Sequence, residues 1–260
     1  MSYSTFHNHT TFCDGKNTPE EMVRAAIEAG MPSIGFSAHS YTFFDESYCM
    51  QKADIPRYLE EIARLKKVYR NEIRILCGIE QDCCSTEPTD SFDFVIGSMH
   101  YIQHAGRYLD VDNTFEEQAR DVEDCFSGNY YAYASEYYRQ AKTIIQRTKC
   151  TFVGHFDLVS KFNENDRLFN TDDPRYREAA IKACRELCRQ GAIFEINTGA
   201  MAKGYRTSPY PAPFLLDVIA EEGRPVLLSA DAHSTDKLQF ALKEAEQLAK
   251  KHDLKIIYEL

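Results

Sequence analysis

The sequence lacks several features that would assign it to a familiar class. It has no run of about 18 apolar residues, so no membrane span is expected. Its opening, MSYSTFHNHTTF, has neither a basic stretch nor an apolar core, so no secretory signal is expected. Basic residues are not in excess: the formal net charge is -10, which argues against nucleic acid as a main partner. The nine cysteines are scattered, which favours free thiols in the cytoplasm over a disulfide scaffold.

Two common phosphatase and nucleotidase signatures are also missing. No C-x5-R occurs, which excludes the cysteine-phosphatase mechanism, and no G-x-x-x-x-G-K-[ST] occurs, which excludes a P-loop. The composition is that of an ordinary globular protein: of the 260 residues, 43% are hydrophobic and 27% are charged. That length is sufficient for one large α/β domain.

Short apolar runs alternate along the chain with amphipathic stretches. The apolar runs predict strands at 4–7, 32–39, 72–80, 92–99, 150–156, 192–197 and 224–230. Spacing of 3.6 residues predicts helices at 18–30, 55–70, 114–126, 172–191 and 234–252, the first with Thr18 as its N-cap and Gly30 at its end. Alternation of this kind indicates a parallel sheet with helical crossovers, and about seven strands suggest a closed or nearly closed, distorted barrel.

Polar side chains follow the predicted strands at the same point in each. Six of the eight histidines lie there, together with a glutamate and an aspartate, and a second aspartate lies in the first loop. The set is His7, His9, Asp14, His39, Glu80, His100, His155, Asp231 and His233. In a parallel barrel the carboxyl ends of the strands form one rim, where active sites are built. These side chains are therefore expected to converge.

One H-x-H pair is weak evidence by itself, since chance alone gives roughly 0.24 such pairs in this composition. The joint pattern has no good packing explanation, because buried carboxylates are costly unless cations offset them. Nine ligands exceed the need of one tetrahedral zinc ion. Two or three divalent ions are expected, and a set without thiolates suits zinc, manganese or iron.

The motifs HNHTTFCDG, FSAHS, GIEQD, GSMHY, GHFD and SADAHS resemble those of the polymerase-and-histidinol-phosphatase (PHP) superfamily, over residues 5 to about 235. GSMHYI, INTGAMAKGYRTSPYP and the length are most similar to its monofunctional histidinol-phosphate phosphatases. The resemblance implies one PHP domain over 1–260 and a distorted seven-stranded (β/α) TIM-like barrel. It implies a metal site at the carboxyl ends of the strands and hydrolysis of L-histidinol phosphate in histidine biosynthesis.

The resemblance also implies a trinuclear ligand set. The first ion would be held by His7, His9, Glu80 and Asp231, and the second by Glu80, His100 and His155, with Glu80 bridging. The third would be held by Asp14, His39 and His233. Of these side chains, Glu80, Asp231 and His233 are expected to be catalytic. A metal-activated hydroxide would attack the phosphorus atom of the substrate.

A small phosphomonoester is therefore the expected partner, with no nucleic acid or membrane. A basic clamp for its phosphate is expected from loops that follow the fifth and sixth predicted strands, which carry Lys161, Asn197, Lys203 and Arg206. Acids in the long loop expected at 101–118, after the fourth predicted strand, namely Asp110 and Asp112, are expected to face the cationic part of the substrate. Solvated surface charges are the alternative interpretation for all six residues.

Other interpretations stay open. YLDVDNT (108–114) matches the D-x-D-x-T loop of haloacid-dehalogenase phosphatases, but QHAGR before it predicts no strand, and TDDP (171–174) fits a helix start. A PHP phosphoesterase of other or broad specificity, a metal-dependent amidohydrolase and a non-catalytic metal-stabilised module are further alternatives. His104, expected in a loop, and His252 are not expected to be ligands, and Cys184 and Cys188 are expected to be buried apolar residues.

Overall fold

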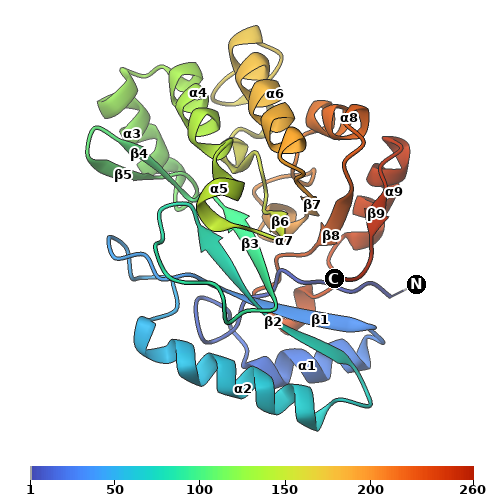
Figure 1. The fold of residues 1–260 in the computed structure, drawn as a ribbon. Coiled ribbons are helices and arrows are strands. Elements are labelled where there is room, and N and C mark those ends of the chain that lie inside the picture. Colours follow the sequence, from blue (N-terminus) through green and yellow to red (C-terminus); the bar gives the residue numbers. More distant parts are fainter. Residues whose placement is uncertain (1) are drawn as a thin grey trace.

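The computed structural model describes residues 2–260, and its central feature is a curled parallel sheet of seven strands in the order β1-β2-β3-β6-β7-β8-β9 (Figure 1). The strands are β1 (Ser33–His39), β2 (Arg74–Asp82), β3 (Phe94–Ser98), β6 (Phe152–Val153), β7 (Phe194–Asn197), β8 (Val226–Ser229) and β9 (Ile256–Ile257). Every neighbouring pair is parallel. The predicted α/β class with a parallel sheet is confirmed.

The amino-terminal segment lies between β1 and the end of β8. The predicted strand at 4–7 is absent as a continuous strand; isolated bridges pair Thr5 with Ile34 and Asn8 with Ala232. The backbone of this segment forms hydrogen bonds on both sides: the Gly35 amide donates to the carbonyl of Thr5, and the His9 amide donates to the carbonyl of Ala232 at 2.8 Å. Because the segment divides its hydrogen bonds between two neighbours, it forms no regular ladder with either, yet it is fixed in place.

The helices cover the outside of the sheet, with α1 and α2 below β1 and β2 in Figure 1 and α3 to α6 on the far side of β3. Their bounds are α1 (Pro19–Glu28), α2 (Ile55–Val68), α3 (Phe115–Phe126), α4 (Tyr130–Ala141), α5 (Ile144–Thr148), α6 (Pro174–Arg189), α7 (Gly199–Ala202), α8 (Pro213–Glu221) and α9 (Leu242–Lys251). The predicted N-cap of α1 is confirmed, since the Thr18 hydroxyl accepts from the Glu21 amide and the Glu21 carboxylate accepts from the Thr18 amide. No helix of residues 2–260 is long and apolar enough to cross a membrane.

A small apolar cluster fills the space below the carboxyl ends of the strands. It joins Phe6, Leu76, Phe94, Ile96, Phe152 and Leu227, which come from the amino-terminal segment and four strands. Alternate residues of a strand share a face, so Leu76, Gly78 and Glu80 point the same way. A Cβ on Gly78 would lie 2.3 Å from the Phe94 ring, so only glycine fits there. The strand that carries Glu80 is thus packed tightly up to the polar rim.

Several sequence predictions are wrong in detail. The predicted strand at 150–156 is reduced to β6, and the predicted helix at 234–252 is broken into a 3-10 turn at Thr235–Lys237 and α9, because Ala241 has a φ of 53°. The predicted loop at 101–118 begins instead with an antiparallel hairpin, formed by β4 (Tyr101–His104) and β5 (Arg107–Asp110). Helices α4 and α8 and strand β9 were not predicted.

Candidate metal centre

The carboxyl ends of β1, β2, β3, β6 and β8 bring all nine predicted ligands together with the amino-terminal segment. Four groups place candidate ligand atoms within 4.8 Å of one another. These groups are His9, Asp14, His39 and His233; His7, Glu80 and His155; His7, His9 and Asp231; and His39, Glu80 and His100. The groups share members, so they form one continuous site rather than separate ones.

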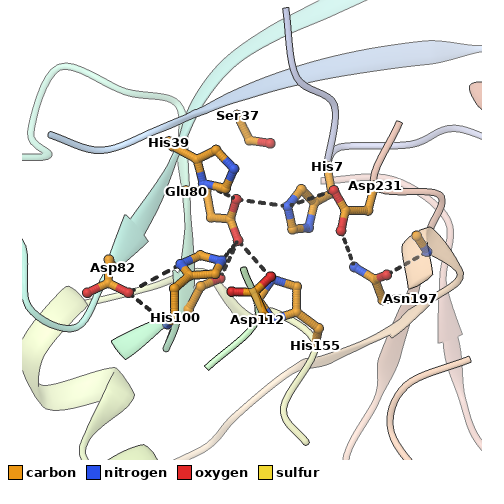
Figure 2. Close-up of polar contacts among 12 residues, drawn as sticks. His7, Ser37, His39, Glu80, Asp82, His100, Asp112, His155, Asn197 and Asp231 are labelled. Atoms are coloured by element: carbon orange, nitrogen blue, oxygen red, sulfur yellow. Dashed lines mark hydrogen bonds and ion pairs between the residues drawn. The ribbon is translucent and has the colours of Figure 1, made fainter. Parts of the chain in front are cut away.

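Glu80 lies at the centre of the site and is 1% exposed (Figure 2). Its two carboxylate oxygens face different histidines. Oε1 is 2.9 Å from Nε2 of His155 and 3.3 Å from Nε2 of His100. Oε2 is 3.1 Å from Nε2 of His7 and 3.0 Å from Nδ1 of His39. A carboxylate in this position can bridge two cations, one on each oxygen.

A second carboxylate gathers three imidazoles on the outer side of the site. Asp14 Oδ2 is 3.1 Å from Nε2 of His233, and Oδ1 is 3.6 Å from both Nε2 of His39 and Nδ1 of His9. The ring of His9 stacks between those of His39 and His233, at centroid distances of 4.3 and 4.2 Å. His9 therefore belongs to two groups, because its Nε2 also lies 3.3 Å from Oδ1 of Asp231.

The donor set fits divalent cations. Nε2 of His7, Nε2 of His9 and Oε2 of Glu80 are buried and, despite their short mutual distances, make no hydrogen bond within residues 2–260. Such an arrangement is costly unless a cation satisfies these atoms. Oxygen and imidazole donors without a thiolate suit zinc, manganese or iron. The residues present therefore fit divalent cations in the type of donor and in the convergence of the donor atoms.

The charges within the site also indicate a need for cations. Burial would raise the pKa of Glu80, but the imidazoles of His7, His39 and His100 hold it well below its usual range. Burial would lower the pKa of His7, but the neighbouring carboxylates raise it well above its usual value. His9 differs: burial and the two stacked imidazoles lower its pKa to about 3. The carboxylates need positive charge, which either imidazolium groups or bound cations can supply.

Three buried side chains that support the ligands were missed from the sequence. Asp82 accepts from the His100 amide at 2.8 Å and lies 3.2 Å from Nδ1 of that ring, and the Ser98 hydroxyl donates to Glu80 at 2.7 Å. Glu195 on β7 contacts Nδ1 of His7 at 3.0 Å. A signal for Glu195 existed: it is the one charged residue in the apolar run AIFEIN, where a buried carboxylate requires partners.

A cavity of about 260 Å³ opens over the candidate ligands. Two of the predicted phosphate-binding residues, Lys161 and Lys203, line it, and so do the two predicted acids, Asp110 and Asp112. Aromatic residues complete the wall: Tyr48, Tyr101, Tyr205 and Tyr210. The cavity thus combines cations, carboxylates and aromatic rings beside the candidate ligands.

The predicted basic clamp is only partly assembled at this cavity. Lys203 Nζ lies 3.3 Å from Nε2 of His233. Lys161 is buried and donates to the Asp112 carboxylate at 2.9 Å. Arg206 does not line the cavity, since its guanidinium bonds Ser160 instead. Asn197 also lies behind the wall, where its amide donates to Glu195 at 2.8 Å and to Asp231 at 3.3 Å.

The two acids on the cavity wall differ in environment. Burial and the charge of Asp112 raise the pKa of Asp110 to about 7. Burial would raise the pKa of Asp112 as well, but Lys161 lowers it to about 2. Asp110 also accepts from the amides of Asp112 and Asn113, both at 2.8 Å, so it shapes the turn that follows the hairpin.

The first aspartate of YLDVDNT does end a strand, because β5 covers Arg107–Asp110. That strand is half-exposed and belongs to a two-stranded antiparallel hairpin, whereas dehalogenase chemistry needs a buried strand of the central sheet. Thr114 is the N-cap of α3 and Asp173 that of α6, as expected for helix starts. The structure therefore does not support a dehalogenase site at Asp110, although the prediction that no strand precedes this residue is wrong.

The two remaining histidines lie away from the centre. His104 is in β4, not in a loop as predicted, and its ring packs on Phe126 at a centroid distance of 4.6 Å. His252 follows α9 and pairs with Asp217 at 2.6 Å. Cys184 and Cys188 are buried on α6, as predicted.

The chain resembles known proteins along most of its length. The family model described as "PHP domain" matches residues 5–199. A protein of Deinococcus radiodurans named "Probable histidinol-phosphatase" is 28% identical, covering 92% of this chain and 89% of that protein. "Histidinol-phosphatase" of Bacillus subtilis is 28% identical, covering 90% of this chain and 95% of that protein.

A solved structure shares the fold. Histidinol phosphate phosphatase from Lactococcus lactis subsp. lactis, crystallised with zinc, L-histidinol and phosphate, superimposes with a TM-score of 0.73 and 22% identity. The match covers 98% of this chain and 95% of the other.

Proposed function

Because this chain belongs to the PHP domain family, we propose that it is a metal-dependent phosphomonoesterase that hydrolyses L-histidinol phosphate to L-histidinol and phosphate. One observation carries the proposal most strongly: the two carboxylate oxygens of Glu80 face two different sets of imidazoles in a buried site. Relatives that cover most of the chain carry the name histidinol-phosphatase, which supports the choice of substrate.

The proposed ligands are the nine side chains already described, with Glu80 shared between two ions. His7, His9 and Asp231 would complete one position, and His100 and His155 a second. Asp14, His39 and His233 would hold a third ion on the outer side. Two or three ions of zinc, manganese or iron would then sit at the carboxyl ends of the strands of a distorted (β/α)7 barrel. We treat 1–260 as a single PHP domain, and a cytoplasmic location stays a prediction.

Bound divalent ions would lower the pKa of a water molecule and neutralise phosphate oxygens during in-line displacement. The protein supplies orientation and charge. Glu80 keeps the imidazoles of both positions at fixed separations. Asp231 and His233 line the cavity next to Lys203, so we assign these two side chains, with Glu80, to the catalytic group. Lys203 would draw phosphate oxygens toward His233 by its charge.

Lys161 and the acids would define the rest of the substrate pocket. Lys161 can donate to a phosphate oxygen only if it loosens its bond to Asp112. Asp110 and Asp112 would then attract the ammonium and imidazole of the substrate. Arg206 and Asn197 take indirect roles in this proposal: Arg206 fixes Ser160 beside Lys161, and Asn197 holds Asp231.

The experiment that tests this function compares kcat/KM for L-histidinol phosphate with values for neutral and aryl phosphomonoesters, using metal-loaded protein. We expect a strong preference for the cationic amino-alcohol phosphate. Equal kcat/KM for histidinol phosphate and aryl phosphates would indicate a PHP phosphoesterase of broad or different specificity.

A further inference from the structure

Strand β7 contributes none of the nine candidate ligands, yet it carries a buried carboxylate directly behind them. Glu195 is 1% exposed. Its Oε1 accepts from the His155 amide at 2.7 Å and from the Asn197 side chain at 2.8 Å. Nδ1 of His7 lies 3.0 Å from Oε2 and 3.2 Å from Oε1, so Oε2 is its nearer partner. One carboxylate thus receives three donors from three segments of the rim.

The contact with His7 determines which ring nitrogen carries hydrogen. An ionised carboxylate only accepts hydrogen bonds, so the Nδ1 that faces Glu195 must be the donor. In the neutral ring Nε2 then has a free lone pair. That Nε2 is buried, lacks a hydrogen-bond partner and lies 3.1 Å from Oε2 of Glu80, at the centre of the site.

We propose that Glu195 is a positioning residue of the metal centre, which holds His7 with Nδ1 protonated and Nε2 directed to a cation. Asn197 extends this role, because its amide spans Glu195 and Oδ2 of Asp231. Strand β7 carries no candidate ligand itself, but through Glu195 and Asn197 it positions two of them, His7 and Asp231. This inference rests on the proposed metal-dependent function.

A purely structural role is the alternative. Glu195 would then serve only as an acceptor for the His155 amide and Asn197, and its contact with His7 would be incidental. The two roles predict opposite orders for two substitutions. Glutamine has the same shape as glutamate but carries one donor group, whereas aspartate is one methylene shorter but remains acceptor-only.

The orientation of glutamine at this position can be deduced from the three donors. Its carbonyl would replace Oε1, which keeps the bonds to His155 and Asn197. Its amide group would replace Oε2, the oxygen nearer to Nδ1 of His7, at 3.0 Å against 3.2 Å for Oε1. That nitrogen would become an acceptor, so hydrogen would move to Nε2, where it can bond Glu80 but blocks a cation. In the opposite orientation the amide group would face the His155 amide and the Asn197 side chain. Two hydrogen bonds would then be lost to keep the one from His7.

The test measures Zn²⁺ affinity by competition with a chromophoric chelator, and Zn²⁺ content by elemental analysis. We expect Glu195→Gln to weaken binding of at least one ion about ten- to hundredfold. We expect Glu195→Asp to weaken it less. Unfolding temperatures of the metal-free variants show whether each protein is folded.

Asp157→Asn is the matched control. Asp157 is also buried and accepts from a backbone amide, that of Ala212 at 3.0 Å, but it makes no hydrogen bond to an imidazole within residues 2–260. We expect this control to change stability without changing Zn²⁺ affinity. Glu195→Gln binding Zn²⁺ as tightly as Glu195→Asp, or no more weakly than the control, would overturn the proposal.

The outcome is separable from that of the proposed function. If the wild type binds Zn²⁺ but does not hydrolyse histidinol phosphate, the substrate assignment fails while the order of the Glu195 variants still tests the positioning role. If the wild type binds none of Zn²⁺, Mn²⁺ and Fe²⁺, both fail together.

Discussion

The rim of the sheet has two halves that hold their side chains by different means. The first half rests on long strands: β1, β2 and β3 have seven, nine and five residues. Within it His39 and Glu80 are paired in parallel register, so the ladder itself places them side by side. The second half rests on β6, β7 and β8, with two, four and four residues.

In the second half every candidate ligand follows its strand, whereas in the first half His39 and Glu80 lie in their strands and His100 alone follows one, with its amide bonded to Asp82. His155 comes two residues after β6, and Asp231 two residues after β8 with a φ of 49°. Side chains replace the ladder there: Glu195 holds the His155 amide, and Asn197 holds Asp231. The difference teaches that a rim can be built on short strands if buried polar side chains on a neighbouring strand fix the ligands.

Glu80 joins the two halves, so its removal should have the largest effect. Glu80→Ala removes the group that faces His39 and His100 in the first half and His155 in the second. We expect loss of bound metal and at least about a hundredfold lower activity. Elemental analysis and turnover of the purified variant check this. Near-normal turnover with full metal content would show that the bridge lies elsewhere.

A smaller effect is expected from Gly199→Ala, which disturbs only the second half. A Cβ at this position would lie 2.6 Å from Oδ2 of Asp231, so the carboxylate must shift. We expect about a tenfold loss of activity. This is the lower end of the losses seen when residues that orient metal ligands are mutated. Ala202→Ser on the same short helix is the control and should leave activity unchanged. Unaltered activity of Gly199→Ala would mean that the position of Asp231 is not constrained.

Ser98→Ala tests whether the first half tolerates the loss of one side-chain bond. The hydroxyl donates to Glu80 at 2.7 Å, but the backbone of β2 still holds Glu80 between β1 and β3. A hydrogen bond to a charged group contributes about 1.5 kcal/mol or more, and we expect metal affinity to fall by less than about tenfold because the ladder remains. If Ser98→Ala lost more metal affinity than Gly199→Ala, measured in the same assay, the comparison between the halves would be reversed.

The smallest effect is expected on the cavity wall, outside both halves. Asp110→Asn removes a charge that we assign to recognition of the substrate cation. KM for histidinol phosphate should rise a few-fold, about what a partly exposed charge pair contributes, while KM for an aryl phosphate should not. A parallel rise for both substrates would show that Asp110 acts only through the turn that it stabilises.

The site was more predictable from the sequence than the fold around it. Histidines and acids after successive apolar runs could be recognised because the carboxyl ends of parallel strands must meet at one edge. His39 and Glu80 illustrate this, since each ends an obvious apolar run. The supporting residue Glu195 was not predicted, because its role depends on a contact with His7, 188 residues away in the chain.

The fold was predicted in class but not in detail. The amino-terminal segment was expected to be a strand, but it shares its backbone hydrogen bonds between β1 and Ala232, three residues after β8, which no local pattern reveals. The hairpin β4–β5 was missed because its strands have four residues each and join through Ala105 and Gly106 in left-handed conformations. Short elements depend on tertiary contacts more than on local sequence.

The most direct test of the central claim is the dependence of phosphate release on metal ions. Protein freed of metal by chelation, and checked by elemental analysis, should release no phosphate from L-histidinol phosphate. Addition of Mn²⁺, Zn²⁺ or Fe²⁺ should restore activity as two or three ions bind per chain. Full activity in the metal-free preparation would contradict the assignment of the nine converging side chains as metal ligands.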